Sequence, residues 1–277
     1  MSRTTIRSIH SRYEEGVPLA MLTAYDATFA RLVERGGVDM ILVGDSAGDN
    51  QLGYDSTIPV TMDQAVSNTA AVVRGTEQAL VIGDMPFGSY GASIERSVEN
   101  ATRFLKEAGA GGVKLETAPG GERTVELVER LTEIGIPVQG HIGLTPQRRH
   151  ELGGAVVQGR AGPASEYADR LVQTASRLVE AGVFSLVIEA TTEGVAKRVS
   201  EAVDVPTIGI GAGRVTDGQV LVVNDVLGLG EQEYSLAKRY ADLDSIVETA
   251  VAEFVSDVRQ GRFPDATNAY DPIDADR

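Results

Sequence analysis

The sequence contains no cysteine and no tryptophan among its 277 residues. The absence of cysteine excludes disulfide bonds and thiolate zinc sites, and it is compatible with a reducing compartment. No apolar run is long enough to cross a bilayer, and the charged segment from Met1 to Glu15 is not typical of a secretory signal. We therefore expect a cytoplasmic protein that does not bind membranes.

Lysine is also scarce, because only Lys106, Lys114, Lys197 and Lys238 are found among the 25 basic residues. The formal net charge of −15 disfavours binding to a nucleic-acid backbone or an anionic membrane. An acidic, lysine-poor surface is expected of a halophilic protein, since high salt screens self-repulsion. An ordinary acidic cytosolic protein with a bias toward arginine explains the composition equally well, so both interpretations stay open.

Short apolar runs alternate with longer helical patterns along the chain. Eight runs rich in valine and isoleucine predict strands at residues 19–23, 40–43, 80–82, 113–115, 138–140, 186–188, 207–210 and 220–223. Apolar residues at helical spacing predict helices at residues 65–74, 94–108, 123–134, 166–181 and 243–260. A sheet of eight parallel strands that alternate with helices can close into a barrel. We predict an α/β fold, a (β/α)₈ barrel in a single domain of residues 1–264, followed by an acidic, flexible tail at residues 265–277.

A loose internal repeat marks the strand ends. In LVERGGVDMILVGD, LKEAGAGGVKLE, LTEIGIPVQGH and LVEAGVFSLVIE, a helix ends, a glycine follows, and an apolar strand leads to a polar residue. These polar residues are Asp45, Glu116, His141 and Glu189, and Asp84 closes the third strand in the same way. In a barrel all five would lie at the carboxyl rim, where barrel enzymes have their active sites.

Three of these residues are carboxylates on neighbouring strands. Asp45, Asp84 and Glu116 would repel one another unless they were protonated or bridged by a cation. Oxygen ligands without cysteine suit Mg²⁺, which takes one or two protein carboxylates and completes its shell with substrate and water. We therefore predict a magnesium site at Asp45, Asp84 and Glu116, although any single one of them could instead cap a helix or bind a loop.

The other polar residues suggest roles in binding and proton transfer. Lys114 lies two residues before Glu116, so both side chains should point toward the barrel axis. A buried lysine needs an anion, which a substrate carboxylate or a neighbouring acid could supply, and Ser46 could donate to the same anion. Glu189 is the candidate general base, or else a buried structural acid. His141 could donate to a substrate oxygen or act as an acid, or it could only position the loop that follows.

The chain resembles the ketopantoate hydroxymethyltransferase family over about residues 5–264. The segments that carry the resemblance include MLTAYDATFA, ILVGDSAGDNQLGYDSTIPVTMDQ, GDMPFGSY, VKLE, PVQGHIGLTPQ, VIEA and IGIGAGRVTDGQVLVVND. Many long motifs in the same order are more specific than any short pattern. The sequence departs from the family pattern at Asp49-Asn50, at Tyr54 in place of a histidine, and in residues 234–240. These departures bear on folate affinity and loop structure more than on the reaction.

The resemblance implies a barrel of the phosphoenolpyruvate-mutase type. It implies transfer of a hydroxymethyl group from 5,10-methylenetetrahydrofolate, or a related pterin, to 3-methyl-2-oxobutanoate, which forms 2-dehydropantoate for pantothenate and coenzyme A biosynthesis by way of a magnesium-stabilised enolate. It also implies one Mg²⁺ per subunit and assembly as a homodecamer. The implied site residues are Asp45, Asp84 and Glu116 for the metal, Asp45, Ser46, Asp84 and Lys114 for the 2-oxoacid, and Glu189 as proton acceptor.

Two other functions are compatible with such a barrel. A magnesium-dependent carbon–carbon lyase of the same barrel type would also bind a 2-oxoacid, but such enzymes usually carry a catalytic cysteine, and this sequence has none. A catalytically inactive binding barrel would have no use for the inward charges of Lys114, Glu116 and Glu189. Magnesium-dependent turnover would distinguish the enzyme from the binding barrel.

Overall fold

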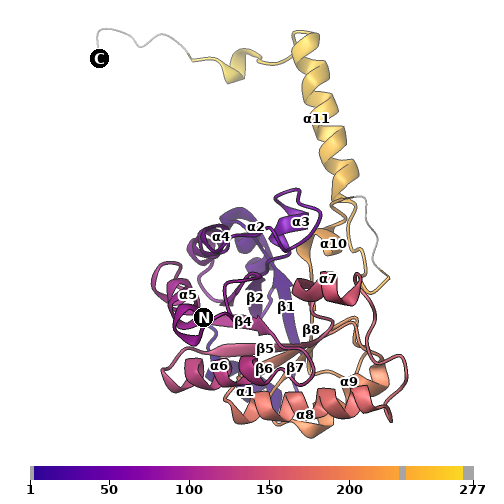
Figure 1. The fold of residues 1–277 in the computed structure, drawn as a ribbon. Coiled ribbons are helices and arrows are strands. Elements are labelled where there is room, and N and C mark those ends of the chain that lie inside the picture. Colours follow the sequence, from indigo (N-terminus) through magenta and orange to yellow (C-terminus); the bar gives the residue numbers. More distant parts are fainter. Residues whose placement is uncertain (1–2, 231–234, 271–277) are drawn as a thin grey trace. The chain divides into compact units, whose positions relative to one another are not determined.

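The computed structural model describes residues 3–230 and 235–270. Eight parallel strands form a closed barrel in chain order, with β8 paired to β1. The strands are β1 (Leu19–Thr23), β2 (Met40–Val43), β3 (Leu80–Asp84), β4 (Gly112–Glu116), β5 (Val138–Gly143), β6 (Ser185–Glu189), β7 (Thr207–Ile210) and β8 (Gly218–Leu221). Helices surround the strands in Figure 1. The predicted (β/α)₈ barrel is confirmed.

The helices begin at residues suited to capping. The main barrel helices are α1 (Ile6–Glu14), α2 (Ala27–Arg35), α4 (Met62–Gly75), α5 (Ile94–Lys106), α6 (Glu122–Glu133), α8 (Glu166–Glu180) and α9 (Glu193–Ala202), with short turns at α3 (Ala47–Asn50), η1 (Pro146–Arg148) and α7 (Arg149–Leu152). Thr61 and Gln64 form a capping box at the start of α4. The predicted helices agree with α4, α5, α6 and α8 to within a few residues.

The last strand differs from its prediction. The sequence predicts a strand at residues 220–223, whereas β8 begins at Gly218 and ends at Leu221. Gly218 pairs with Leu19 and Ile208, and a Cβ atom at this position would lie 2.5 Å from the Leu19 carbonyl oxygen. The amide of Val223 donates instead to the Thr23 hydroxyl at 3.0 Å, where the short helix α10 (Val223–Leu227) begins. The strand predicted from the valine-rich pattern therefore lies two residues too far along the chain.

Two apolar clusters hold the barrel together. One lies between the strands and the outer helices and includes Phe104, Leu131 and Leu178. The other contains alternate strand residues such as Met21 and Ile208, together with Ile9 of α1, so α1 covers the amino end of the barrel. Burial of each such side chain stabilises the fold by about 1.5–3 kcal/mol. The apolar interior at the amino end leaves the polar side chains at the carboxyl end.

Residues 224–277 group into a second compact unit. This unit contains α11 (Leu243–Arg259) and the short turn η2 (Ala266–Asn268), and no residue of α11 is buried. The single domain ending at residue 264 stays a prediction, and most of the expected acidic tail lies outside the described residues. No helix in the described part of the chain is long and apolar enough to span a membrane.

One partly buried carboxylate, that of Glu34, joins α2 to the segment before β3. The oxygens of Glu34 accept hydrogen bonds from the amides of Glu77, Gln78 and Ala79, at distances from 2.7 to 3.1 Å. Partial burial alone would raise the pKa of Glu34, but these three donors outweigh it and hold that pKa below its ordinary value. The ionised side chain therefore stabilises the folded state.

Glu34→Gln is expected to lower the free energy of unfolding by about 1–3 kcal/mol at neutral pH, since charged hydrogen bonds are lost. Because the folded-state pKa is depressed, this stabilisation is present above the unfolded pKa and disappears as the pH falls through the folded pKa. Urea unfolding at several pH values measures it. Glu14→Gln, at an exposed position on α1, serves as the control. An equal loss at acidic and neutral pH would contradict the role of the charge.

Candidate active site

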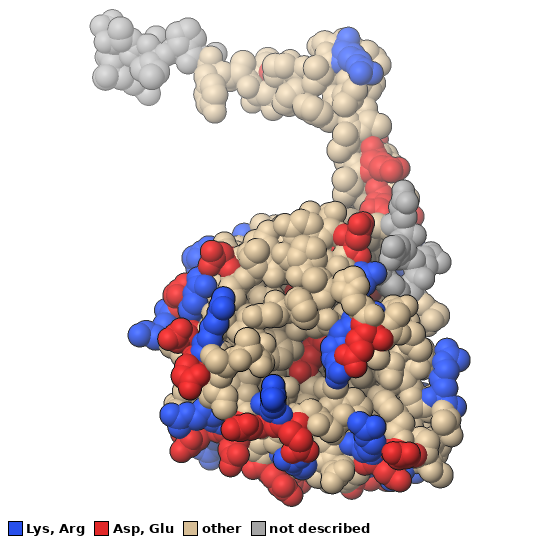
Figure 2. Space-filling view, in the orientation of Figure 1, with Lys and Arg blue, Asp and Glu red and all other residues tan. Residues whose placement is uncertain are grey.

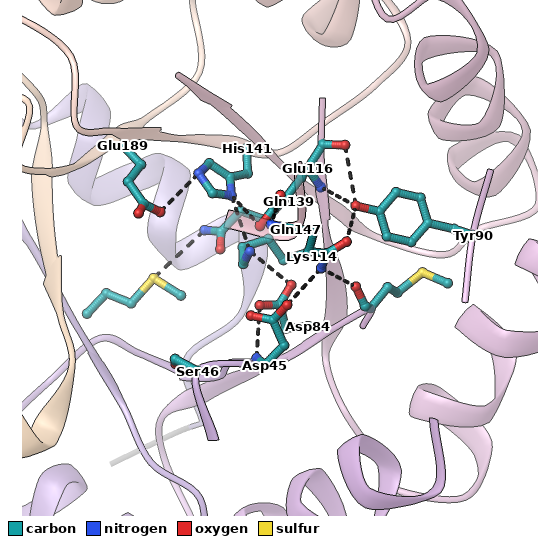
Figure 3. Close-up of polar contacts among 12 residues, drawn as sticks. Asp45, Ser46, Asp84, Tyr90, Lys114, Glu116, Gln139, His141, Gln147 and Glu189 are labelled. Atoms are coloured by element: carbon teal, nitrogen blue, oxygen red, sulfur yellow. Dashed lines mark hydrogen bonds and ion pairs between the residues drawn. The ribbon is translucent and has the colours of Figure 1, made fainter. Parts of the chain in front are cut away.

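The predicted rim residues meet at the carboxyl end of the barrel. The parallel register places Asp84 beside Lys114, and Glu116 beside His141. Lys114 and Glu116 are both buried and lie on one face of β4, as the period-two rule predicts. Figure 3 shows these side chains converging with Glu189 from β6. The structure thus brings together residues from five strand ends.

An ion pair lies at the centre of the site. The Nζ atom of Lys114 is 2.9 Å from Oδ1 of Asp84, and the Asp45 amide donates to Oδ2 of Asp84 at 3.2 Å. Burial raises the pKa of Asp84 to about 7, with the Lys114 charge opposing this rise and Asp45 adding to it. Burial also raises the pKa of Glu116. The structure therefore favours an additional cation beside these acids.

Lys114 stays protonated in this environment. Burial by itself would lower the pKa of Lys114, but the carboxylates of Asp84, Glu116 and Asp45 raise it above its ordinary value. One ammonium group cannot neutralise three carboxylates, so net negative charge remains when all three are ionised. That charge disfavours a bound 2-oxoacid unless a cation accompanies it.

The donor set fits Mg²⁺, although the three acids do not form a ready-made cage. In the described ranges no three histidine or acidic side chains are arranged to hold a metal ion together. One oxygen of Asp45 and one of Glu116 accept hydrogen bonds from Gln147, at 2.9 and 3.1 Å. Mg²⁺ commonly takes only one or two acidic protein ligands, which these carboxylates could supply. Metal ligation by Asp45, Asp84 and Glu116 stays a prediction.

His141 connects the ion pair with Glu189. Its Nδ1 atom is 3.3 Å from Lys114 Nζ, and its Nε2 atom is 3.2 Å from Oε2 of Glu189. Burial and the Lys114 charge lower the pKa of His141, so the ring is neutral near pH 7. A protonated lysine can only donate, so Nδ1 accepts and the ring hydrogen is on Nε2, which lies near Glu189 without a well-aligned hydrogen bond to it. The tautomer of His141 is thus inferred from its contact with Lys114.

The loop that follows β2 is closely packed at its start. The hydroxyl of Ser46 is 2.9 Å from the phenol oxygen of Tyr25, and this oxygen also accepts a hydrogen bond from Thr23 at 3.1 Å. A Cβ atom at Gly44 would lie 2.6 Å from Oγ of Ser46, so a larger residue here would displace the Ser46 hydroxyl. Ser46 is therefore held next to Asp45, where it can donate to a bound anion.

Reasoning from the sequence assigned no role to Gln147 or Tyr90. Gln147 donates to the carboxylates of Asp45 and Glu116. The Tyr90 hydroxyl donates to Gln147 at 2.8 Å and accepts from the backbone amide of Glu116 at 3.1 Å. They lie in loops, where neither strand alternation nor helical spacing indicates the direction of a side chain. Their positions in the motifs GDMPFGSY and PVQGHIGLTPQ are the one sequence signal for them.

Two departures from the family pattern have structural partners. The Tyr54 hydroxyl accepts a hydrogen bond from Gln64 of α4 at 3.0 Å. Asp49 lies at an exposed position of α3, where its carboxylate accepts a hydrogen bond from the Asn50 side chain at 3.0 Å. The third departure begins at Tyr234, which lies outside the described residues.

The fold is shared with solved structures of low sequence identity. A phosphonopyruvate hydrolase in complex with oxalate and Mg²⁺ has a TM-score of 0.62 and 12% identity, covering 97% of this chain and 93% of that one. A phosphoenolpyruvate phosphomutase from Streptomyces platensis subsp. rosaceus has a TM-score of 0.61 and 13% identity, covering 97% and 92%. The similarity extends to a 2,3-dimethylmalate lyase of the PEP mutase/isocitrate lyase superfamily, with a TM-score of 0.59, 15% identity and coverage of 94% and 90%. These similarities show that the chain shares its barrel fold with these proteins.

Sequence comparison is more specific. The family profile of ketopantoate hydroxymethyltransferase matches residues 3–266. The 3-methyl-2-oxobutanoate hydroxymethyltransferase of Syntrophotalea carbinolica is 47% identical over 270 residues, covering 97% of this chain and 98% of that protein. The enzyme of the same name from Halobacterium salinarum is 46% identical over 272 residues, covering 98% and 97%. The chain belongs to the ketopantoate hydroxymethyltransferase family.

Proposed function

We propose that this chain transfers a hydroxymethyl group from 5,10-methylenetetrahydrofolate to 3-methyl-2-oxobutanoate and forms 2-dehydropantoate for pantothenate and coenzyme A biosynthesis. The observation that carries the proposal is the chain of contacts from Asp84 through Lys114 and His141 to Glu189. Lys114 is a cation that can stabilise an oxyanion, and Glu189 is a carboxylate that can accept a proton. Removal of a proton next to a carbonyl group requires both.

Substrate binding would use the cationic side of the site. The ammonium group of Lys114 and the hydroxyl of Ser46 would donate to the carboxylate and keto oxygens of the 2-oxoacid. Lys114 is already oriented by Asp84 at 2.9 Å, so it is positioned before the substrate arrives.

Proton removal would use Glu189. The side chain of Glu189 is 20% exposed, so a substrate can reach it from the rim, while His141 is buried behind it. Glu189 would accept the C3 proton. Addition of water to the methylene carbon of the folate would break its two C–N bonds, with the two water protons passing to the nitrogens, and release tetrahydrofolate and the one-carbon unit as an aldehyde. The carbanionic C3 would then form the new bond to that aldehyde carbon, and the proton held by Glu189 would pass to its oxygen to give the hydroxymethyl group. The Nε2 hydrogen of His141 would hold the Glu189 oxygen in place while the other oxygen takes the proton.

We also propose Mg²⁺ as the cofactor, held by the carboxylates of Asp45, Asp84 and Glu116. When bound, Mg²⁺ would act as a Lewis acid that stabilises negative charge on the keto oxygen. Support comes from the uncompensated negative charge of the site and from the fold relative named for its complex with oxalate and Mg²⁺.

The test of this function is formation of 2-dehydropantoate from 3-methyl-2-oxobutanoate, followed by mass spectrometry with Mg²⁺ present. One set of reactions contains 5,10-methylenetetrahydrofolate and another contains methylenetetrahydromethanopterin as the donor. Product in the first set supports a folate enzyme, and product in the second alone assigns a related pterin. Absence of product in both, with intact folded protein, would overturn the proposal and favour a binding barrel.

We further propose a cytoplasmic homo-oligomer, with the decamer that the family resemblance implies. Helix α11 supports assembly because Ile246, Val251 and Phe254 are each more than half exposed, at 60, 54 and 55%. Exposed apolar rows of this kind are usually covered by another protein surface, and most soluble oligomers are formed by copies of one chain.

Adaptation to high salt is proposed from the net charge of −15 and the four lysines. Figure 2 shows acidic and basic side chains intermixed on one face of the barrel unit, so salt also weakens attractive pairs there. We expect net repulsion to dominate, and the melting temperature to rise as KCl increases from about 0.1 to 2 M. A parallel series in sucrose controls for general solute effects. A flat or falling melting temperature in KCl would support an ordinary acidic protein.

A further inference from the structure

Gln147 joins the loops that follow four different strands. Gln147 lies in η1 after β5 and is only 5% exposed. Its side chain and backbone contact Asp45 after β2, Met85 and Tyr90 after β3, and Glu116 at the end of β4. Figure 3 shows Gln147 among the acidic side chains of the site. No step proposed above uses it.

The orientation of the Gln147 amide is determined by its partners. The Nε2 group donates to Oδ2 of Asp45 and to the carbonyl oxygen of Met85, both at 2.9 Å. The Oε1 atom accepts a hydrogen bond from the hydroxyl of Tyr90 at 2.8 Å. A flipped amide would place its oxygen against a carboxylate and a carbonyl, so the flip is disfavoured. The carboxamide therefore acts as a fixed donor toward Asp45.

Gln147 occupies one oxygen on each of two carboxylates. The side chain holds Oδ2 of Asp45, and the backbone amide donates to Oε2 of Glu116 at 3.1 Å. Each acid then has its other oxygen available for a cation. Calcium takes six to eight oxygens and often binds both oxygens of one carboxylate, whereas Mg²⁺ is smaller and needs fewer protein ligands. Restricting each carboxylate to one oxygen disfavours the larger ion.

We infer that Gln147 is a positioning residue that orients Asp45 and Glu116 for binding through a single oxygen and thereby favours Mg²⁺ over Ca²⁺. The inference rests on the proposed function, in which these acids hold the metal. Because Gln147 acts through the carboxylates, its removal should change metal affinity and metal preference more than a loss of packing would.

The test compares Gln147→Met with Gln139→Met. Both remove a buried glutamine of the same barrel and replace it with a side chain of similar volume. Gln139 is a matched control because its Nε2 group contacts Ser185 at 2.9 Å and the sulfur of Met21 at 3.9 Å, and neither is an acid of the site. Isothermal titration of the full-length protein with MgCl₂ and with CaCl₂ gives the two dissociation constants, and thermal unfolding monitors the fold.

Gln147→Met is expected to weaken Mg²⁺ binding by about 10–100-fold, as loss of partners that orient metal ligands commonly does. Its preference for Mg²⁺ over Ca²⁺ should shrink, while Gln139→Met keeps both the affinity and the preference. If Gln147→Met does not fold, Tyr90→Phe frees the amide oxygen and should change the same two constants in the same direction.

Two results would overturn the inference, and they are distinguishable. Unchanged Mg²⁺ affinity and unchanged preference in folded Gln147→Met would remove the role of Gln147 and leave the proposed function intact. Failure of the wild-type chain to bind Mg²⁺ at all would remove the proposed metal site, and the inference with it.

Discussion

Glu189→Gln is expected to lower kcat by about 10²–10⁴-fold, the usual contribution of a general base. Glutamine has nearly the same shape and can still accept the Nε2 hydrogen of His141, which lies 3.2 Å from the present carboxylate oxygen. It cannot accept a proton from substrate C3. The KM for the 2-oxoacid and the melting temperature should therefore change little, and steady-state kinetics with thermal unfolding measure all three.

Glu193→Gln is the control for the loss of a rim carboxylate. Glu193 begins α9, four residues after Glu189, and its side chain is 44% exposed. Its replacement should leave kcat close to that of the wild type. Near-normal kcat in Glu189→Gln would contradict the assignment of Glu189 as the base, and His141 would then be the next candidate.

Removal of divalent metal with EDTA is expected to reduce turnover to background and to lower the melting temperature. Mg²⁺ at about 100 times its Kd would stabilise the folded state by about 3 kcal/mol, because it binds that state alone. Return of excess Mg²⁺ should restore both properties. Full activity after exhaustive chelation would contradict a metal requirement.

The stabilisation by Mg²⁺ should depend on pH in a defined direction. Burial raises the pKa of Asp84 to about 7, so the metal-free folded state holds a proton that the unfolded state releases at lower pH. The stability that protonated Asp84 gives the metal-free folded state is therefore lost as the pH rises through about 7. The gain in melting temperature on adding Mg²⁺ should grow between about pH 6 and 8, because the ionised carboxylate is the form that binds the metal. Asp84→Asn should flatten this trend, and thermal unfolding across the pH series measures it.

Most of the barrel could be predicted because strand alternation and helical spacing are local properties. The bounds of β1, β2 and β7 agree with the predicted ranges. β8 could not be placed correctly, since its start depends on the close approach of Gly218 to Leu19 on a distant strand. A long-range contact of this kind leaves no periodic pattern in the sequence.

The strand-borne part of the site was predictable for the same reason. Alternation on β4 places Lys114 and Glu116 on one face, and the parallel register adds Asp84 and His141 beside them. Gln147 and Tyr90 could not be predicted, because loop backbone determines where they point. Their 2.8 Å contact joins residues 57 positions apart in the chain.

The central claim is that the site removes the C3 proton of a 2-oxoacid with the help of Glu189 and a divalent metal. Proton NMR of 3-methyl-2-oxobutanoate in D₂O, with the protein and Mg²⁺ but without folate, tests it most directly. We predict loss of the C3 proton signal with the wild-type chain, and no loss with Glu189→Gln or with EDTA. Persistence of the C3 signal with wild-type protein and Mg²⁺, even after a folate analogue is added to complete the site, would contradict the account.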